Sequence, residues 1–515
     1  MAGLRAWLSA LLLAALPIHP ALAATTSPSY ADPQVIPGDD ELDQELTLER
    51  VLTRSARFYP SILEALQQRE QAAGKVTSTE GAFDLLFEAD TFGYLGGFYN
   101  GRTFTSTVTQ PLRAFGGEVY GGWDLSAGEL PIYYDEYFTN KGGRLKVGVL
   151  FSLMKDRTID DRRFAIRDAR LALQQVELDV LITRIGVQRK AAAAYWYWRA
   201  LGRQLRAYES LLALSLARDD ALQAQVRRGA RARIDLTENA RNITNRRVLV
   251  ATARAAFDKA ANALALYYRD DNGMMQAPRR AQLPAEMPIA AQAEADQGSR
   301  VLAPTIALLP EILARHPSIQ RLNVAAQRAN AELALARNEL EPTLDLTFDL
   351  AQSAGGIGQG GVSRDSTDPI VGLKFSVPLQ RRKARGEVAA AEAELSSLDA
   401  QRRLQTDQLT QQFADLLVEL RAAEDLEQLA QLELEQNRTL VRAENARMRQ
   451  GASDFFLINL REVSAANAEV ALLKASLRRQ LARIDIDAAT LNFESLGLPA
   501  PAGTPVSTTG TPADR

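Results

Sequence analysis

The chain has 515 residues, no cysteine, 24% charged residues and a formal net charge of −3, which is the composition of an ordinary folded protein. The lack of cysteine excludes disulfides, thiolate nucleophiles and thiolate metal sites. A near-neutral charge without a strongly basic stretch argues against a nucleic-acid partner.

Histidine is almost as scarce as cysteine. His19 lies in the N-terminal apolar segment, and His316 precedes a proline at a helix start, where a capping or packing role is expected. Hydrolytic triads and histidine metal sites therefore have almost no residues to draw on. We expect no enzymatic activity, no catalytic residue, no metal and no cofactor.

Residues 1–23 have the features of a secretory signal peptide. Arg5 supplies the positive start, an apolar stretch follows, and residues 21–23 form the small-residue cleavage motif. The apolar run is too short for a membrane anchor, and Pro17 interrupts it. We expect an exported protein that begins with an extended leader over residues 24–41.

The rest of the chain repeats one pattern twice. A Pro-Ser-Ile helix start (residues 60–62 and 317–319) precedes alternating segments, a very long helical stretch, a glycine-centred turn and a return helix. A period of two between helical periods predicts a β-hairpin mounted on a helical hairpin in each half. The predicted divisions are a first repeat over 42–270, a connector over 271–303, a second repeat over 304–498 and a disordered tail over 499–515.

Each repeat is predicted to hold one strand pair, within residues 83–153 and 343–379. Apolar side chains alternate there with small or charged ones, and Lys146 and Lys374 fall on the charged side. A lipid-facing strand with a wet lumen behind it requires this alternation, although a soluble sandwich would also show it. The segments approach the 9–11 residues that span a bilayer. We expect both lysines to face the lumen, and an unusually large external loop within the first pair.

The helical stretches are the strongest pattern in the sequence. Residues 157–226 contain no proline, and at 1.5 Å per residue they extend roughly 105 Å. Residues 381–448 behave alike, with apolar positions stepping by four and three as in a coiled coil. Return helices are predicted over 234–268 and 455–493. Together with these return helices, the two long stretches predict two long antiparallel helical hairpins that need packing partners.

Four strands in one chain cannot close a transmembrane barrel. In lipid every backbone amide must be paired, and the smallest barrels have about eight strands. If the strands span a bilayer, several copies must share one barrel. Two copies would give eight strands and three would give twelve, and the strand count does not choose between them.

Residues 42–498 resemble the outer-membrane efflux proteins, the TolC-like channels. The most specific features are the sequence Val-Pro-Leu before two arginines at a strand-to-helix junction, and a glycine at each hairpin tip. The residues that carry the resemblance are Val377, Pro378, Leu379, Arg381, Arg382, Gly451, Arg228, Gly229, Asp235, Leu236, Ala240, Tyr195, Trp196, Leu283 and Pro284.

The resemblance implies a mainly α fold with a small β part. It implies a homotrimer whose 12-stranded transmembrane β-barrel lies, multi-pass, in the Gram-negative outer membrane and continues as a periplasmic α-helical coiled-coil tunnel. Such a chain is the passive exit duct of a tripartite efflux pump or type I secretion system. Its partners are outer-membrane lipid, a periplasmic adaptor and an inner-membrane transporter of RND, ABC or MFS type. The alternative is a periplasmic adaptor, which two long hairpins and two strand pairs disfavour.

The hairpin tips hold the candidate gate and docking residues. Leu457 occupies the place where the family often has an acidic gate residue, so Asp235 and Asp454 are the acidic candidates, with helix capping as the alternative role. A hydrophobic constriction by Phe455 and Phe456 is the other possibility. The tip residues proposed to dock an adaptor are Arg228, Gly229, Arg231, Gly451 and Ser453.

Overall fold

The computed structural model describes residues 44–131, 138–285, 309–358, 366–450 and 452–499. The predicted signal peptide and leader, part of the connector, the tail from residue 500 and Gly451 lie outside these residues. The described helices and strands all belong to one compact unit, residues 46–515.

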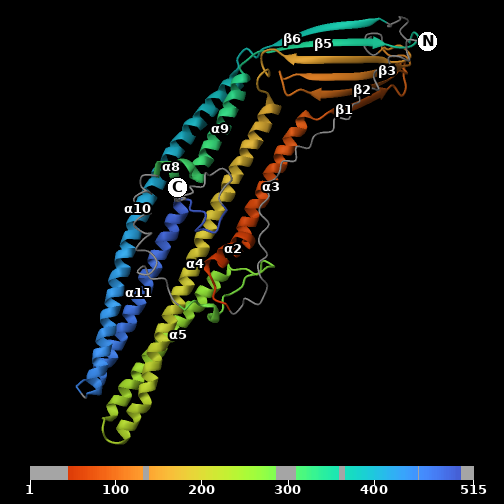
Figure 1. Ribbon diagram of the computed structural model, residues 1–515. Helices are drawn as coiled ribbons and strands as arrows, with labels where there is room; N and C mark the ends of the chain where they lie inside the picture. Colours follow the sequence, from red (N-terminus) through yellow and green to blue (C-terminus); the bar gives the residue numbers. More distant parts are fainter. Residues whose placement is uncertain (1–43, 132–137, 286–308, 359–365, 451, 500–515) are drawn as a thin grey trace, which may run out of the picture. The chain divides into compact units, whose positions relative to one another are not determined.

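Helices make up most of the described chain (Figure 1). The helices α3 and α9, which lead into the sheet, have 21 and 22 residues, whereas α4 and α10, which follow it, have 67 and 68. The helices are α2 (Leu48–Phe58), α3 (Pro60–Glu80), α4 (Asp161–Arg227), α5 (Arg233–Ala265), α8 (Leu309–Arg315), α9 (Pro317–Asn338), α10 (Arg382–Arg449) and α11 (Phe455–Ala489).

Helix starts follow from local sequence. The Asp160 carboxylate accepts a hydrogen bond from the Arg163 amide at 2.8 Å and caps α4. His316 caps α9, because its Nδ1 accepts from the Ser318 amide at 3.3 Å and Pro317 takes the first helical position. The only histidine of the described chain is thus a helix cap, as its place in the sequence suggested.

The predicted helical hairpins are present. α4 packs along α5, α10 packs along α11, and α4 also contacts α3, α9 and α11 (Figure 1). At 1.5 Å per residue, α4 and α10 each carry a hairpin tip roughly 100 Å from the strand that precedes them.

The largest apolar core lies where α2, α4, α5 and α11 meet. Trp198 of α4 is fully buried and stacks on Phe257 of α5 with ring centroids 6.1 Å apart. The Tyr195 hydroxyl donates to the Leu46 carbonyl at 3.0 Å, so the polar end of this aromatic ring is satisfied.

One antiparallel sheet joins the two repeats, in the order β1-β2-β3-β4-β5-β6. β4 of the first repeat pairs with β5 of the second, with Val149 opposite Phe348. The strands are β1 (Leu86–Gly93), β2 (Arg102–Pro111), β3 (Glu118–Ala127), β4 (Arg144–Ser152), β5 (Thr343–Ser353) and β6 (Thr367–Ser376).

The expectation of two strands in the first repeat was wrong. β2 and β3 occupy the segment assigned to a large external loop, so the described chain has six strands instead of four. β2 is rich in threonine, and Gly121 and Gly122 interrupt the alternation of β3, so neither strand shows a strong apolar period. Packing explains why residue 122 is a glycine, because a Cβ on Gly122 would lie 2.7 Å from Cε of Lys146.

Among the residues that the structure describes, none of the helices combines the length and the apolar character that crossing a membrane requires.

The two glycines inside α4 should respond oppositely to the same substitution. A Cβ on Gly202 would lie 2.6 Å from Leu283 and 2.9 Å from Phe257, whereas a Cβ on Gly186 meets nothing within 4 Å. We expect Gly202→Ala to destabilise the fold by about 1 kcal/mol, because overpacking of about 1–3 kcal/mol outweighs the gain in helix propensity. Gly186→Ala, the control, should stabilise by about 0.5–1 kcal/mol. Thermal melting followed by circular dichroism at the helix band measures both, and equal shifts would contradict this packing.

Candidate functional site

The first hairpin tip joins α4 to α5. Arg228 is the C-cap residue of α4, and Gly229 makes the turn with a φ of +73°, which favours glycine. Asp235 lies in the first turn of α5 but does not cap it, because the N-cap is Ala232. Its carboxylate instead lies 3.7 Å from Nη1 of Arg231, so the acidic candidate and one docking candidate form an ion pair.

The second tip joins α10 to α11. The Asp454 carboxylate accepts from the Leu457 amide at 2.7 Å, which makes it the N-cap of α11. The Ser453 hydroxyl donates to the Asp454 carbonyl at 3.4 Å. Asp454 therefore combines an exposed negative charge with a structural role at the helix start.

The two phenylalanines of the second tip face different surroundings. Phe455 is 4% exposed, and the Arg218 guanidinium lies 6.0 Å from its ring centroid. Phe456 is 65% exposed. Of the two candidates for a hydrophobic constriction, only Phe456 is exposed in the single chain.

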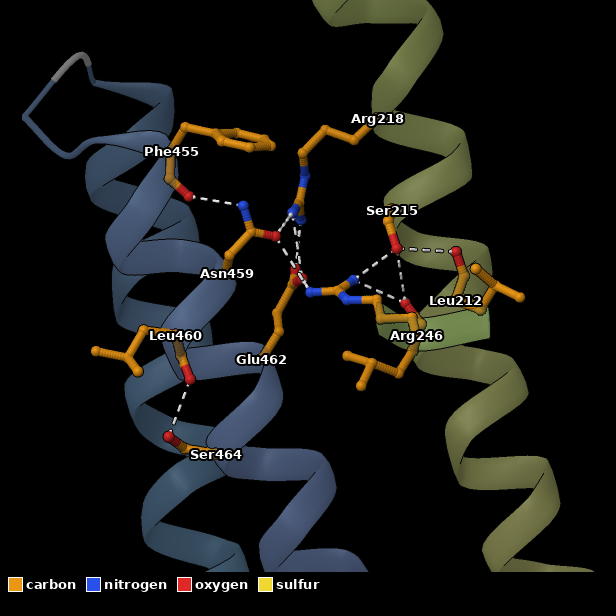
Figure 2. Close-up of polar contacts among 10 residues, drawn as sticks. Leu212, Ser215, Arg218, Arg246, Phe455, Asn459, Leu460, Glu462 and Ser464 are labelled. Carbon is orange, nitrogen blue, oxygen red and sulfur yellow. Dashed lines mark hydrogen bonds and ion pairs between the residues drawn. The ribbon is translucent and has the colours of Figure 1, made fainter. Parts of the chain in front are cut away.

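A buried charged cluster lies one to two turns beyond the second tip (Figure 2). We call Arg218, Arg246, Asn459 and Glu462 the Glu462 cluster. Nη1 of Arg218 donates to Oε2 of Glu462 at 3.1 Å, and Nη2 of Arg246 donates to the same oxygen at 3.2 Å. The Asn459 side-chain oxygen accepts from both guanidinium groups, at 3.4 and 3.1 Å. The cluster therefore joins α4 and α5 of the first hairpin to α11 of the second.

Arg246 is the most enclosed charge of the cluster. It is 2% exposed, and it also donates to the Leu211 carbonyl at 2.8 Å and the Ser215 hydroxyl at 2.9 Å. Burial lowers the pKa of Arg246, while the Glu462 carboxylate, itself 4% exposed, opposes this shift. Because an arginine stays protonated in proteins, the pair remains ionic.

The sequence analysis missed this cluster, although a signal was present. The buried stripe of α11 includes Phe455, Ile458, Asn459 and Glu462, at the 3–4 residue spacing of one helix face. A carboxylate on such a stripe requires a buried cationic partner. Several arginines of α4 and α5 could supply it, so the sequence alone does not single out Arg246.

The sheet has one polar and one apolar face across all six strands. Nζ of Lys146 lies 3.2 Å from Oδ1 of Asp124, and Lys374 stands opposite Asp345 in the register. The charged residues that share this face are Glu88, Asp90, Glu118, Asp124, Arg144, Lys146, Asp345, Asp349, Asp368 and Lys374. Carboxylates outnumber cations on this face, while Val147, Phe348 and Leu373 are among the apolar residues opposite.

Within the described ranges, no group of three or more histidine, aspartate or glutamate residues could hold a metal ion.

Comparison with known proteins gives one family match, in the second repeat. Residues 308–490 match the outer membrane efflux protein family. A sequence comparison with curated proteins gives no match. The second repeat thus carries an outer membrane efflux protein domain, and the resemblance seen in the sequence is confirmed.

Solved outer-membrane channels share the fold. The open state of the MtrE outer membrane channel of Neisseria gonorrhoeae has a TM-score of 0.60 and 16% identity, covering 88% of this chain and 89% of that one. The CmeC outer membrane channel of Campylobacter jejuni has a TM-score of 0.58 and 14% identity, covering 91% and 98%. The outer membrane protein VceC of Vibrio cholerae has a TM-score of 0.58 and 15% identity, covering 86% and 95%. Residues 308–490 thus match the outer membrane efflux protein family, and the chain shares its fold with these channels.

Neutralising Glu462 should loosen the contact between the two hairpins. Glu462→Gln keeps the size of the side chain but leaves Arg246 buried without its counter-charge, which costs about 3–5 kcal/mol. Denaturant unfolding should show this loss, and hydrogen exchange should rise in α5 and α11. The matched control is Glu419→Gln, which removes an exposed α10–α11 pair with Arg478 and should change stability little. Similar small effects of both variants would show that the cluster does not hold the hairpins together.

Proposed function

We propose that several copies of the chain, three by resemblance to the efflux proteins, form a passive exit duct of a tripartite pump or type I secretion system. The observation that carries this proposal is an amphipathic sheet with two open edges, mounted on helical hairpins roughly 100 Å long. The apolar face fits outer-membrane lipid, and the polar face, with Lys146 and Lys374, fits a wet lumen.

The partners proposed at the tips are a periplasmic adaptor and, through it, an inner-membrane transporter of RND, ABC or MFS type. Arg228 and Arg231 provide positive charge beside the Gly229 turn, which suits acidic residues on an adaptor. Ser453 would contribute to the same surface on the second tip, and Gly451, proposed with it from the sequence, lies outside the described residues. The adaptor function for this chain itself is not favoured, because the structures that share its fold are channels.

The gate proposed at the entrance is acidic. Asp235 and Asp454 lie at the two tips, and copies arranged around an axis would place them in rings that attract cations. The Glu462 cluster holds the two hairpins of one copy together behind these rings.

Loss of the duct should make its cell sensitive to the exported compounds. A deletion strain tested against a panel of toxic compounds is expected to show higher susceptibility to a subset of them. The intact gene should restore resistance, and deleting the partner adaptor should produce the same spectrum, because a passive duct acts only with its pump. A susceptibility profile identical to that of the parent strain, with secretion also unchanged, would count against this function.

Removing the tip carboxylates should weaken cation preference. Asp454→Asn removes the charge but keeps an N-cap, because asparagine caps as well as aspartate. Asp235→Asn removes the other charge at the cost of the pair with Arg231. Planar-bilayer recordings should show lower cation selectivity and weaker block by multivalent cations, with Ser453→Ala as the uncharged control. If both variants keep the selectivity of the parent, Phe456 becomes the gate candidate.

A further inference from the structure

Among the described residues, the hairpin β2–β3 has no counterpart in the second repeat, where the strands are β5 and β6. Two places for it are conceivable. It could belong to the outside of the membrane as an elaborated loop, or it could be part of the transmembrane wall. The register, the strand lengths and the connections decide between them.

The register continues both faces of the sheet through this hairpin. Thr107 of β2 stands between Glu88 of β1 and Gly122 of β3 on the polar face. Val108 stands between Phe87 and Gly121 on the apolar face. In an external loop with water on both sides, nothing would favour apolar side chains on one face and polar side chains on the other.

Strand length gives the same answer. β2 and β3 have 10 residues each, within the 8 to 11 residues of the other four strands. A tilted strand of about 9–11 residues spans a bilayer. Both strands therefore have the length that a membrane wall requires.

The connections also have the arrangement of a barrel. The short β2–β3 turn lies on the helix side, where the Ser152 amide donates to the Phe115 carbonyl at 3.2 Å and a Cβ on Gly116 would lie 2.2 Å from the Asp156 carbonyl oxygen. At the end of the sheet away from the helices, the Gly101 amide donates to the Glu129 carbonyl at 2.8 Å. This hydrogen bond links the β1–β2 loop to the β3–β4 loop, and both are longer than the β2–β3 turn. Short turns on the periplasmic side and longer external loops are typical of outer-membrane barrels.

The two edges of the six-stranded sheet suit a second copy of this chain. β1 and β6 each pair with one strand only in the described chain, β1 is exposed throughout, and β6 is exposed at all but one residue. With an even number of alternating strands, β6 of one copy meets β1 of the next in antiparallel orientation. A six-stranded barrel within one chain is below the smallest transmembrane size of about eight strands.

We propose that each copy contributes all six strands to the shared barrel, with β6 of one copy paired to β1 of the next. Resting on the trimer of the proposed function, six strands from each of three copies give eighteen strands. The twelve-stranded barrel implied by the resemblance counts four strands per copy. Because barrel diameter grows roughly linearly with strand number, the exit pore is about 1.5-fold wider than a twelve-stranded one.

The first arm of the test asks whether β2 lines the membrane. Val108→Cys and Thr107→Cys are matched neighbours on opposite faces, and the parent chain has no cysteine to interfere. In outer-membrane vesicles a water-soluble maleimide should label position 107 and not position 108, whereas both should react after denaturation. Labelling of both positions before denaturation would put the hairpin in water and overturn the proposal.

The second arm asks which strands meet between copies. A cysteine at Phe87 of β1 is combined in turn with a cysteine at Val371, Leu373 or Phe375 of β6, and the matched series replaces Phe87 with Val119 of β3. The β1–β6 series should give oligomers crosslinked between copies, and the β3–β6 series should give none. Crosslinking through β3, or through neither strand in an intact oligomer, would overturn the six-strand contribution.

Direct imaging of the detergent-extracted oligomer completes the test by counting strands. Eighteen strands support the proposal, and twelve refute it while the exit duct itself stands. A protein found outside the outer membrane, with no oligomer, would refute the proposed function instead.

Discussion

The constraint on which the structure depends is the pairing of backbone groups at the two edges of the sheet. β1 and β6 each have one strand neighbour in the described chain. In lipid an unpaired amide or carbonyl costs several kcal/mol, so a sheet whose apolar face contacts lipid cannot keep open edges. In the proposed function, association of copies pairs both edges, and it would place the helical hairpins of all copies around the same axis.

The contacts between the helices change character along their length. Around Trp198 the contacts are apolar, extensive and buried. Behind the tips, the contact between hairpins includes the paired charges of Arg246 and Glu462. Apolar packing needs complementary shapes, whereas a buried ion pair also needs hydrogen-bonding atoms in fixed directions and is costly to break. Near the tips, directional contacts therefore add to the apolar packing between the hairpins.

Much of the fold was predictable because its signals are local and periodic. The long helices, the Pro-Ser-Ile starts and the faces of β4 and β6 follow from spacing alone. The hairpin β2–β3 was not predicted, because Gly122 makes room for the side chain of Lys146 on the next strand, and that reason is visible only in three dimensions.

The site was predicted less completely than the fold. The sequence left two roles open for Asp454, an acidic gate residue or a helix cap. The structure shows that Asp454 caps α11, and the gate role stays a prediction. Phe455 and Phe456 were grouped because they are adjacent, yet neighbouring residues on a helix point about 100° apart and only one of them remains exposed. Glu462 could have been noticed on the buried stripe of α11, but its partners come from helices more than two hundred residues away in sequence.

The central claim is that copies of this chain share one membrane-embedded assembly. Native mass spectrometry of the protein extracted from purified outer membranes measures this most directly, because it reports the number of chains in the particle. The account predicts a trimer that is stable in detergent and absent from the soluble periplasmic fraction. A monodisperse monomer, stable in water without detergent, would contradict it.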